Sequence, residues 1–286
     1  MLKRLLLLLA TAVLPWSLTF RLLKRVARAR QHDPEVQAAL AVAQDLIGID
    51  EPQAFCVRYA LYRLVDDADL AIGLTRGPRW AKKWVQWQGP CFPSCGAFVA
   101  LTFHLGAGVP ALWALGRHDQ GVAWIYALPT PMPTGIALWL ARTRLALVER
   151  LGRAASIATG GARRKAQAWL EAKGAVMALV DAPHFGRRKV TNVCLLGARA
   201  GLARGVAELA LSCAAPVYLY SVRLVGDSGR RVLRVSGPLG EGSVEALMQQ
   251  VAAFLDEELR ADPAAWHFWA QGVLERGFPP SAENEV

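Results

Sequence analysis

The first thirty residues of the chain contain no acidic side chain. Of the formal net charge of +10, seven positive charges lie in this segment: Lys3, Arg4, Arg21, Lys24, Arg25, Arg28 and Arg30. Everything after residue 30 therefore carries a net charge of only +3. That distribution argues against a general nucleic-acid-binding protein, whose basic residues gather on the binding domain itself. Basic residues interleaved with leucines favour attraction to an anionic lipid surface instead.

The sequence also lacks an apolar run long enough for an ordinary transmembrane helix. Leu5 to Phe20 is uncharged, but this run has sixteen residues where a spanning helix needs about twenty, and Pro15 interrupts it. Shallow insertion is therefore as plausible as crossing. A cleaved signal peptide ranks third, because the run continues into Arg21 to Arg25 without a small-residue cleavage pattern. We predict a membrane anchor at residues 1–30, followed by a cytoplasmic domain at 31–286.

Cysteines are few and unpaired in pattern. The five are odd in number and scattered through apolar contexts, at Cys56, Cys91, Cys95, Cys194 and Cys213. A disulfide framework is therefore not expected. Cys91 and Cys95 have no second Cys/His pair at zinc-site spacing, so we predict no metal and no cofactor.

What the sequence does contain is an alternation of strand and helix patterns. Apolar runs at 98–103, 175–180 and 216–223 read as strands, and periodic segments at 161–173 and 205–213 read as helices. The fold class predicted is α/β, with a central mainly parallel sheet flanked by helices and preceded by a hydrophobic, membrane-associating helix.

Other segments extend this pattern. Residues 33–69 are expected to be helical, and the uncharged stretch from Gln120 to Ala141 is divided by prolines into a strand near 122–128 and a helix from 136 to 147. The aromatic and basic segment 80–88 is interpreted as a half-buried strand, or as an edge that faces a membrane.

A histidine follows the first buried strand directly. His104 leads into a turn that contains Gly106 and Gly108, and Pro110 suits the first turn of a following helix. The carboxyl edge of an α/β sheet is where ligands bind, and imidazole transfers protons near neutral pH. Asp181 ends a second strand and should reach the same edge. A histidine packed beside a structural turn is the alternative interpretation.

The same turn also fits a dinucleotide fingerprint, Gly106-x-Gly108-x-x-Ala111. The acid that binds ribose is missing, because the sequence reads Ile125-Tyr126-Ala127 about twenty residues later. A dinucleotide-binding oxidoreductase is therefore a minor alternative. No Gly-x-Ser-x-Gly occurs, which disfavours a serine hydrolase.

Several short motifs together carry a resemblance that spans nearly the whole chain. They are Phe103-His104-Leu105-Gly106, Leu179-Val-Asp181, Leu196-Gly197-Ala-Arg199-Ala-Gly201, Ala215-Pro216-Val217 and Asp262-Pro263-Ala-Ala-Trp266. In their order the chain resembles the bacterial lysophospholipid acyltransferase superfamily, specifically the branch of late lipid A acyltransferases and phosphatidylinositol mannoside acyltransferases.

The resemblance implies an O-acyltransferase at the cytoplasmic face of the bacterial inner membrane. His104 would act as general base on a hydroxyl of a lipid or glycolipid acceptor, which attacks the thioester of acyl carrier protein or acyl-CoA. In the family an acid five residues after the histidine pairs with it, and here that position is Val109. Asp181, or less favourably Asp119, would replace it. A silent homologue that binds lipid without turnover is the rival hypothesis.

The remaining candidate residues would bind substrate. Gly106 and Gly108 would let a substrate approach the backbone, and Arg199, in a turn from Gly197 to Gly201, would bind a phosphate of a head group or a pantetheine carrier. Lipid phosphates or an acidic carrier protein would be contacted by Arg187, Arg188 and Lys189. A solvated loop and an exposed arginine without ligand are the plain alternatives.

Overall fold

A seven-stranded sheet forms the centre of the computed structural model, which describes residues 2–106, 108–126, 134–181, 190–240 and 242–269. The strand order is β1-β9-β8-β2-β5-β3-β4. Their bounds are β1 Val85–Gln88, β2 Phe98–Thr102, β3 Val122–Tyr126, β4 Ile157–Ala158, β5 Ala175–Leu179, β8 Val217–Val225 and β9 Arg230–Leu239. Among the described strands of this seven-stranded sheet, only the β8–β9 pair is antiparallel. The predicted α/β class with a mostly parallel central sheet is therefore confirmed.

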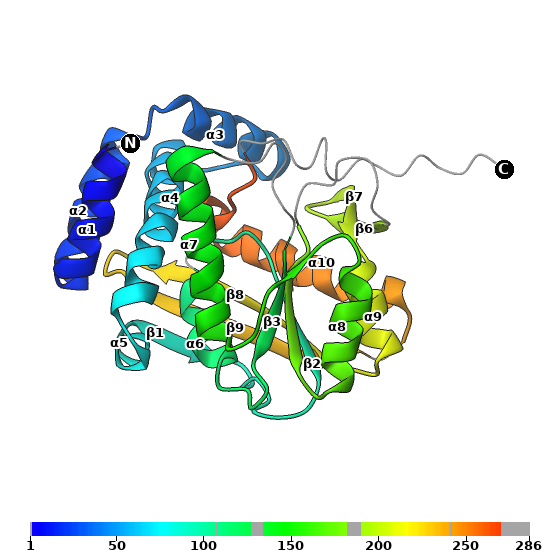
Figure 1. Cartoon of the computed structure of the whole chain (residues 1–286). Coiled ribbons are helices and arrows are strands. Elements are labelled where there is room, and N and C mark those ends of the chain that lie inside the picture. The colour runs from blue at the N-terminus through cyan, green and yellow to red at the C-terminus, as the bar shows by residue number, and fades with distance from the viewer. Residues whose placement is uncertain (1, 107, 127–133, 182–189, 241, 270–286) are drawn as a thin grey trace.

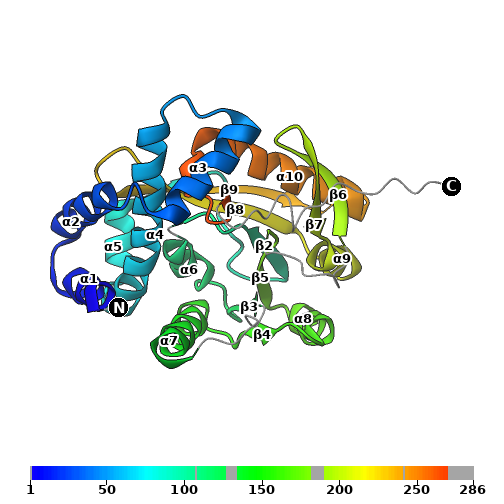
Figure 2. The same cartoon turned by 90° about the horizontal axis from the view of Figure 1, so that it is seen from above.

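Helices cover both sides of this sheet (Figures 1 and 2). On one side lie α4 (Pro52–Thr75), α6 (Val109–Leu115) and α7 (Gly135–Gly152), and on the other α8 (Ala162–Glu171), α9 (Gly205–Ser212) and α10 (Val244–Ala261). α3 (Pro34–Ile47) packs on α4, and the short helix η1 (Pro263–Ala265) lies between α4 and α10. A separate antiparallel hairpin of β6 (Val190–Leu195) and β7 (Ala198–Ala203) rests on α10.

The central strand β2 explains how the sheet places the candidate histidine. All five of its residues are buried, as expected for a strand covered on both faces. β5 and β8 flank it in parallel. Pro110 then lies in the first turn of α6, where its missing N–H costs no hydrogen bond.

The N-terminal apolar run forms two short helices. Pro15 separates α1 (Leu2–Val13) from α2 (Trp16–Ala29), and both lie along α4 (Figure 1). Within the described residues, none of the helices has the length and apolar character needed to cross a bilayer. Membrane association of this segment therefore stays a prediction.

α2 contributes to the core of the body as well. Trp16, Phe20, Leu23 and Ala27 are at most 5% exposed and follow helical spacing along one face. The guanidinium of Arg231, itself fully buried, lies 5.3 Å from the ring centroids of both Trp16 and Trp80. The side chains that face inward from α2 thus pack against residues more than two hundred positions away.

One predicted element is partly wrong. Residues 80–88 are not a single strand, because α5 (Pro78–Trp84) occupies the first half and β1 the second. Trp80 packs edge-on against Trp16, 5.8 Å between ring centroids, and also contacts Trp113. The segment is short and mixes tryptophan with lysine, so its sequence pattern did not distinguish a helical turn from a strand.

Candidate active site

His104 and Asp181 meet at the carboxyl edge of the sheet. Thr102 of β2 is in register with Leu179 of β5, and each strand ends two residues before its titratable side chain. The His104 Nδ1 lies 2.8 Å from the Asp181 Oδ1, and the His104 backbone N–H donates to Oδ2 at 2.8 Å. The proximity that we expected for Asp181 is therefore present in the structure.

A third donor fixes the carboxylate. The indole Nε1 of Trp266 donates to Asp181 Oδ2 at 2.8 Å, and both Trp266 and Asp181 are completely buried. A buried carboxylate is costly unless such donors surround it. Asp181 thus accepts hydrogen bonds from two elements of the fold, which holds its position relative to the imidazole ring.

The segment that carries Trp266 pairs with the histidine turn like a short strand. Leu105 and Trp266 form an antiparallel bridge. The His267 N–H donates to the His104 carbonyl at 2.9 Å, and the Gly106 N–H donates to the Ala265 carbonyl at 2.8 Å. These bonds fix the backbone on both sides of His104.

A second buried carboxylate ties this segment to α4. The hydroxyl of Tyr62 donates to Asp262 Oδ2 at 2.6 Å, and the guanidinium of Arg58 contacts both oxygens of the same carboxylate. Asp262 is 5% exposed. Asp262 therefore links α4 to the segment that carries Trp266.

The remaining ring nitrogen of His104 is suited to proton transfer. With Nδ1 bonded to Asp181, Nε2 has no partner among the described residues, and 32% of the side chain is exposed. In the tautomer in which Nδ1 carries the proton, the carboxylate orients the ring and stabilises the imidazolium that forms when Nε2 accepts a proton. The phenyl ring of Phe268 packs against the imidazole, 4.3 Å between ring centroids.

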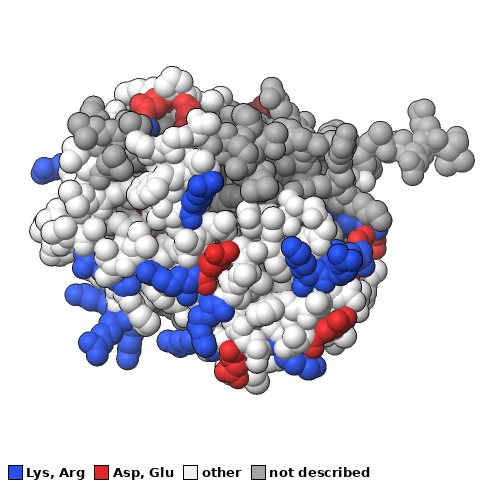
Figure 3. Space-filling model, in the orientation of Figure 1, with Lys and Arg blue, Asp and Glu red and all other residues white. Residues whose placement is uncertain are grey.

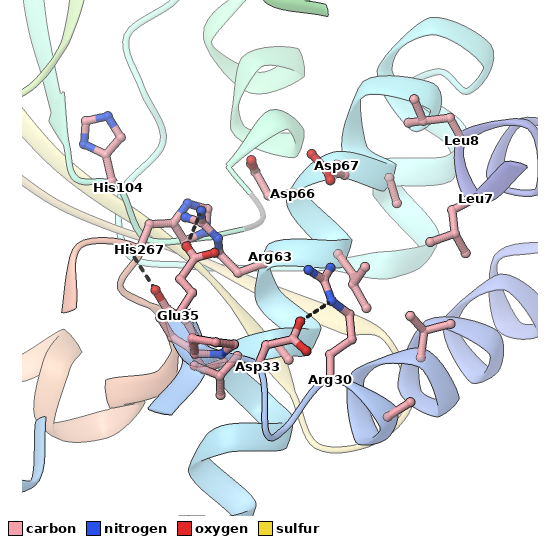
Figure 4. A pocket seen from close by; sticks show the side chains of 18 of the residues that line it. Leu7, Leu8, Arg30, Asp33, Glu35, Arg63, Asp66, Asp67, His104 and His267 are labelled. Carbon is pink, nitrogen blue, oxygen red and sulfur yellow. Dashed lines mark hydrogen bonds and ion pairs between the residues drawn. The ribbon is translucent and has the colours of Figure 1, made fainter. Parts of the chain in front are cut away.

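A large cavity adjoins His104 (Figure 4). Its volume is about 1280 Å³, and α1, α2, α3, α4 and α7 all contribute to its walls. Apolar side chains line it from α1 and α2, namely Leu7, Leu8 and Val26, and from α3 and α4, namely Val36 and Leu64. The cavity thus runs from the predicted anchor to the histidine.

Charged side chains line the same cavity in pairs. The Arg63 Nη2 lies 2.7 Å from Glu35 Oε1, Arg30 Nε lies 2.8 Å from Asp33 Oδ2, and Arg144 Nη1 lies 2.8 Å from Asp66 Oδ2. Asp67 is 3.7 Å from Arg144. Figure 4 shows the first two of these pairs, with Arg63 and Glu35 near His267. Each arginine of the cavity wall therefore has a carboxylate partner.

Two titratable groups in the wall have shifted pKa values. Burial lowers the pKa of His267 to about 4, so its imidazole is neutral near pH 7. Burial raises the pKa of Asp66, but the positive charge and hydrogen bond of Arg144, together with the charges of His267 and Arg63, outweigh burial and lower the pKa to about 2. The Nε2 atom of His267 is inaccessible to solvent and has no hydrogen-bond partner among the described residues.

No protein-family model matches the sequence, and no curated protein matches it either. The function must therefore be argued from the geometry of this site.

Val109 stands where the acyltransferases that the sequence resembles have an acid. Val109 begins α6, and its side chain packs toward Gly73 of α4. Asp119, the other candidate carboxylate, is exposed and precedes β3, at the sheet edge opposite to His104. Of the two carboxylates considered, Asp181 alone reaches the imidazole.

The glycines predicted to bind substrate do not line the cavity. Gly106 is buried against Tyr62 and His267, and its N–H is already bonded to Ala265. Gly108 caps α6, and Gly197 lies in the turn between β6 and β7. Gly201 lies on β7 opposite Asn192. An amide that is already bonded is not free to hold a pyrophosphate, so Gly106 does not fit a dinucleotide site.

The predicted cationic contacts are only partly described. Arg199 lies on strand β7, opposite Cys194, and not in a turn as predicted. Its side chain, and the whole of Arg187, Arg188 and Lys189, lie outside the described residues. Their predicted contacts with phosphates or a carrier protein stay predictions.

Three site residues were not predicted. They are consecutive in the sequence. Trp266 donates a hydrogen bond to Asp181, His267 lines the cavity, and Phe268 packs against His104. The run Trp266-His-Phe-Trp269 is unusual in its density of aromatic and imidazole groups, which was a signal available in the sequence. Among the described residues no group of three or more His, Cys, Asp and Glu side chains is arranged to hold a metal ion.

Proposed function

We propose that the protein is a membrane-associated O-acyltransferase that moves a fatty acyl group from a thioester to a hydroxyl of a lipid or glycolipid acceptor. The observation that carries the proposal is the His104–Asp181 pair, with Nδ1 bonded and Nε2 available, beside a cavity of about 1280 Å³. The resemblance of the sequence motifs to lysophospholipid acyltransferases points in the same direction.

The chemistry follows from the hydrogen bonds of the pair. His104 Nε2 removes the proton from the acceptor hydroxyl, and the oxygen attacks the thioester carbonyl. An ester bond forms, the carbon–sulfur bond breaks, and the imidazolium returns its proton to the departing thiolate. Asp181 stabilises the imidazolium through Nδ1 without being protonated itself. The donor would be acyl carrier protein or acyl-CoA, and the reaction needs no further cofactor.

The distribution of exposed apolar side chains supports membrane association. Large hydrophobic residues at least 37% exposed lie on α1 and α2, between these two helices, and at the end of α4, on α7 and at the end of β8: Leu6, Leu9, Val13, Leu14, Leu18, Leu22, Leu74, Trp139 and Val225. The surface over α1 carries few charges in Figure 3, and basic side chains gather below it, over α5. Apolar residues flanked by cations suit the cytoplasmic surface of a bacterial inner membrane.

The test is acyl transfer by the purified full-length protein. It would be offered long-chain acyl-CoA or acyl carrier protein with a mixture of lysolipids and glycolipids in vesicles, and both thiol release and acylated product would be measured. We expect His104→Ala to lower the rate by about 10²–10⁴-fold. His32→Ala is the matched control, because His32 is an exposed histidine that does not line the cavity.

The rival hypotheses predict different outcomes. A silent lipid-binding homologue would bind lipid and acyl thioester, yet release no thiol in either variant. Release that is equal in His104→Ala and the wild type would remove His104 from the mechanism. Saturable binding of NADH would revive the dinucleotide alternative.

A further inference from the structure

The cavity wall next to His104 combines charges that neutralise one another. Its charged residues are three arginines and four carboxylates: Arg30, Arg63, Arg144, Asp33, Glu35, Asp66 and Asp67. Every arginine has a carboxylate oxygen within 2.8 Å. We propose that this cavity takes a lipid whose head group is an uncharged polyol, such as a glycerol or a sugar, and discriminates against a phosphate. The proposal rests on the proposed function and specifies its acceptor.

The first argument is electrostatic. A phosphate is bound by arginines that can turn their planar fork of N–H groups to it. Here Arg63 is committed to Glu35 and Arg144 to Asp66, with Asp67 also near Arg144. A phosphate would have to displace a carboxylate or lie beside one, and like charges at contact distance repel.

The second argument is the supply of hydrogen-bond acceptors. The imidazole of His267 lines the cavity, but its Nε2 is shielded from solvent and lies against Gly106, so the carboxylates supply the acceptors. A carboxylate has about four lone-pair sites, so one that already binds an arginine can still accept a hydroxyl hydrogen. Hydroxyl groups both donate and accept, and therefore match this mixture better than an anion does.

The third argument places the acyl chain. Leu7 and Leu8 of α1 and Val26 of α2 line the same cavity as the charged residues, so one ligand can meet apolar and polar side chains together. A soluble polyol would leave the apolar wall unused. The cavity therefore suits a single-chain lipid with a hydroxylated head more than a free sugar or free glycerol.

The experiment compares two lipids that differ only by the phosphate. Binding of 1-decanoylglycerol and 1-decanoyl-lysophosphatidate to the full-length protein would be measured by calorimetry, below the concentrations at which either forms micelles. We expect the glycerol lipid to bind at least about tenfold more tightly. Equal binding, tighter binding of the lysophosphatidate, or binding of neither lipid would overturn the proposal. Free glycerol that binds as tightly as decanoylglycerol would overturn its lipid part.

A substitution should shift this preference. Glu35→Gln releases Arg63 from its carboxylate, so the affinity for lysophosphatidate should rise severalfold relative to that for decanoylglycerol. Glu257→Gln is the matched control, because Glu257 forms a comparable partly exposed pair with Arg234 and does not line the cavity. An unchanged preference in Glu35→Gln would contradict the electrostatic argument. Because the readout is binding, it is independent of turnover: absent acyl transfer with retained selectivity would refute the proposed function alone.

Discussion

Trp266 is the residue through which the C-terminal segment contacts the His104–Asp181 pair. Its indole N–H donates to Asp181, whereas the neighbouring Trp269 donates to the backbone carbonyl of Pro263. Both side chains are fully buried, and their rings contact each other at 4.8 Å between centroids. Two tryptophans of equal burial thus differ in whether they support the carboxylate.

We therefore expect Trp266→Phe to lower acyl transfer about tenfold. The variant keeps an aromatic ring in place but removes a hydrogen bond to a charged group, which typically contributes about 1.5–3 kcal/mol. Trp269→Phe is the control for packing. Transfer rates and urea denaturation would be measured for both, together with the pH dependence of the rate. Equal losses of rate in the two variants would reduce Trp266 to a structural role.

The histidine turn makes a separate prediction about glycine. A Cβ added at Gly106 would lie 2.8 Å from Tyr62 Cδ1 and 2.9 Å from His267 Nε2, whereas one at Gly108 would meet nothing within 4 Å. Gly106→Ala should therefore destabilise the protein by about 1–3 kcal/mol in chemical denaturation, and Gly108→Ala by much less. If the two variants unfold at the same urea concentration, the packing of this turn differs from that described.

His267 makes stability depend on pH. Burial lowers its pKa to about 4, below the value of about 6.5 in an unfolded chain. Between these values the unfolded chain binds a proton that the folded protein does not, so stability falls as the pH drops from about 6.5 to about 4, by at most about 3 kcal/mol. His267→Gln should flatten this slope in urea denaturation, while His32→Gln should keep it. A slope that persists in His267→Gln would assign it to another group.

Asp181 and Trp266 differ in how well the sequence predicted their places in the site. Parallel strands bring their carboxyl ends to one edge, so the sequence predicted that Asp181 and His104 share an edge of the sheet. That their strands β5 and β2 are direct neighbours is seen only in the structure. Trp266 reaches Asp181 from 85 positions away through a segment without regular strand or helix pattern. A local helix or strand pattern in the sequence does not predict such a long-range contact.

At the scale of elements, the N-terminal helices present two different faces. The inward face of α2 belongs to the core, and Arg76 binds the carbonyls of Thr11, Ala12 and Leu14 at the corner between α1 and α2. The outward face carries exposed leucines. Deleting residues 1–30 would remove both faces at once and would confuse membrane binding with folding.

Point substitutions on the outward face of α1 separate an effect on membrane binding from an effect on folding. Leu9 and Val13 are 61% and 71% exposed on one side of α1. Replacing both with Glu should lower binding to anionic vesicles at least about tenfold, since each buried apolar side chain contributes about 1.5–3 kcal/mol. The control adds the same charge on α8, as Gln167→Glu with Ala168→Glu. Cosedimentation that is unchanged in the α1 variant would place the membrane contact elsewhere.

The elements that the sequence did not predict include the β8–β9 and β6–β7 hairpins and the helix α5, whose segment mixes tryptophan with lysine. β8 and β9 are antiparallel, and the turn of β6–β7 places Leu196 and Gly197 at positive φ, 54° and 79°. A leucine in the left-handed region gives no turn signal in the sequence. By contrast, β2, β3, β5 and β8 are apolar runs and were predicted within one or two residues of their bounds, whereas the two-residue strand β4 was not predicted.

For the whole molecule, the arrangement connects the predicted membrane face with the His104–Asp181 pair. α1 and α2 lie on one side of the cavity, and β2, β5 and the C-terminal segment hold His104 and Asp181 on the other. A lipid drawn from the membrane would therefore keep its acyl chain against the apolar residues of α1 and α2 while its head group meets the charged wall next to His104. The functional hypothesis requires that His104 and Asp181 act as one unit within this arrangement.

A double-mutant cycle of acyl transfer tests that requirement most directly. Rates would be measured for the wild type, His104→Ala, Asp181→Asn and the double variant, with far-ultraviolet circular dichroism to establish that each is folded. Because Asp181 acts through the imidazole, the double variant should be no slower than His104→Ala alone. A wild-type rate in Asp181→Asn, or two losses that multiply in the double variant, would contradict the account.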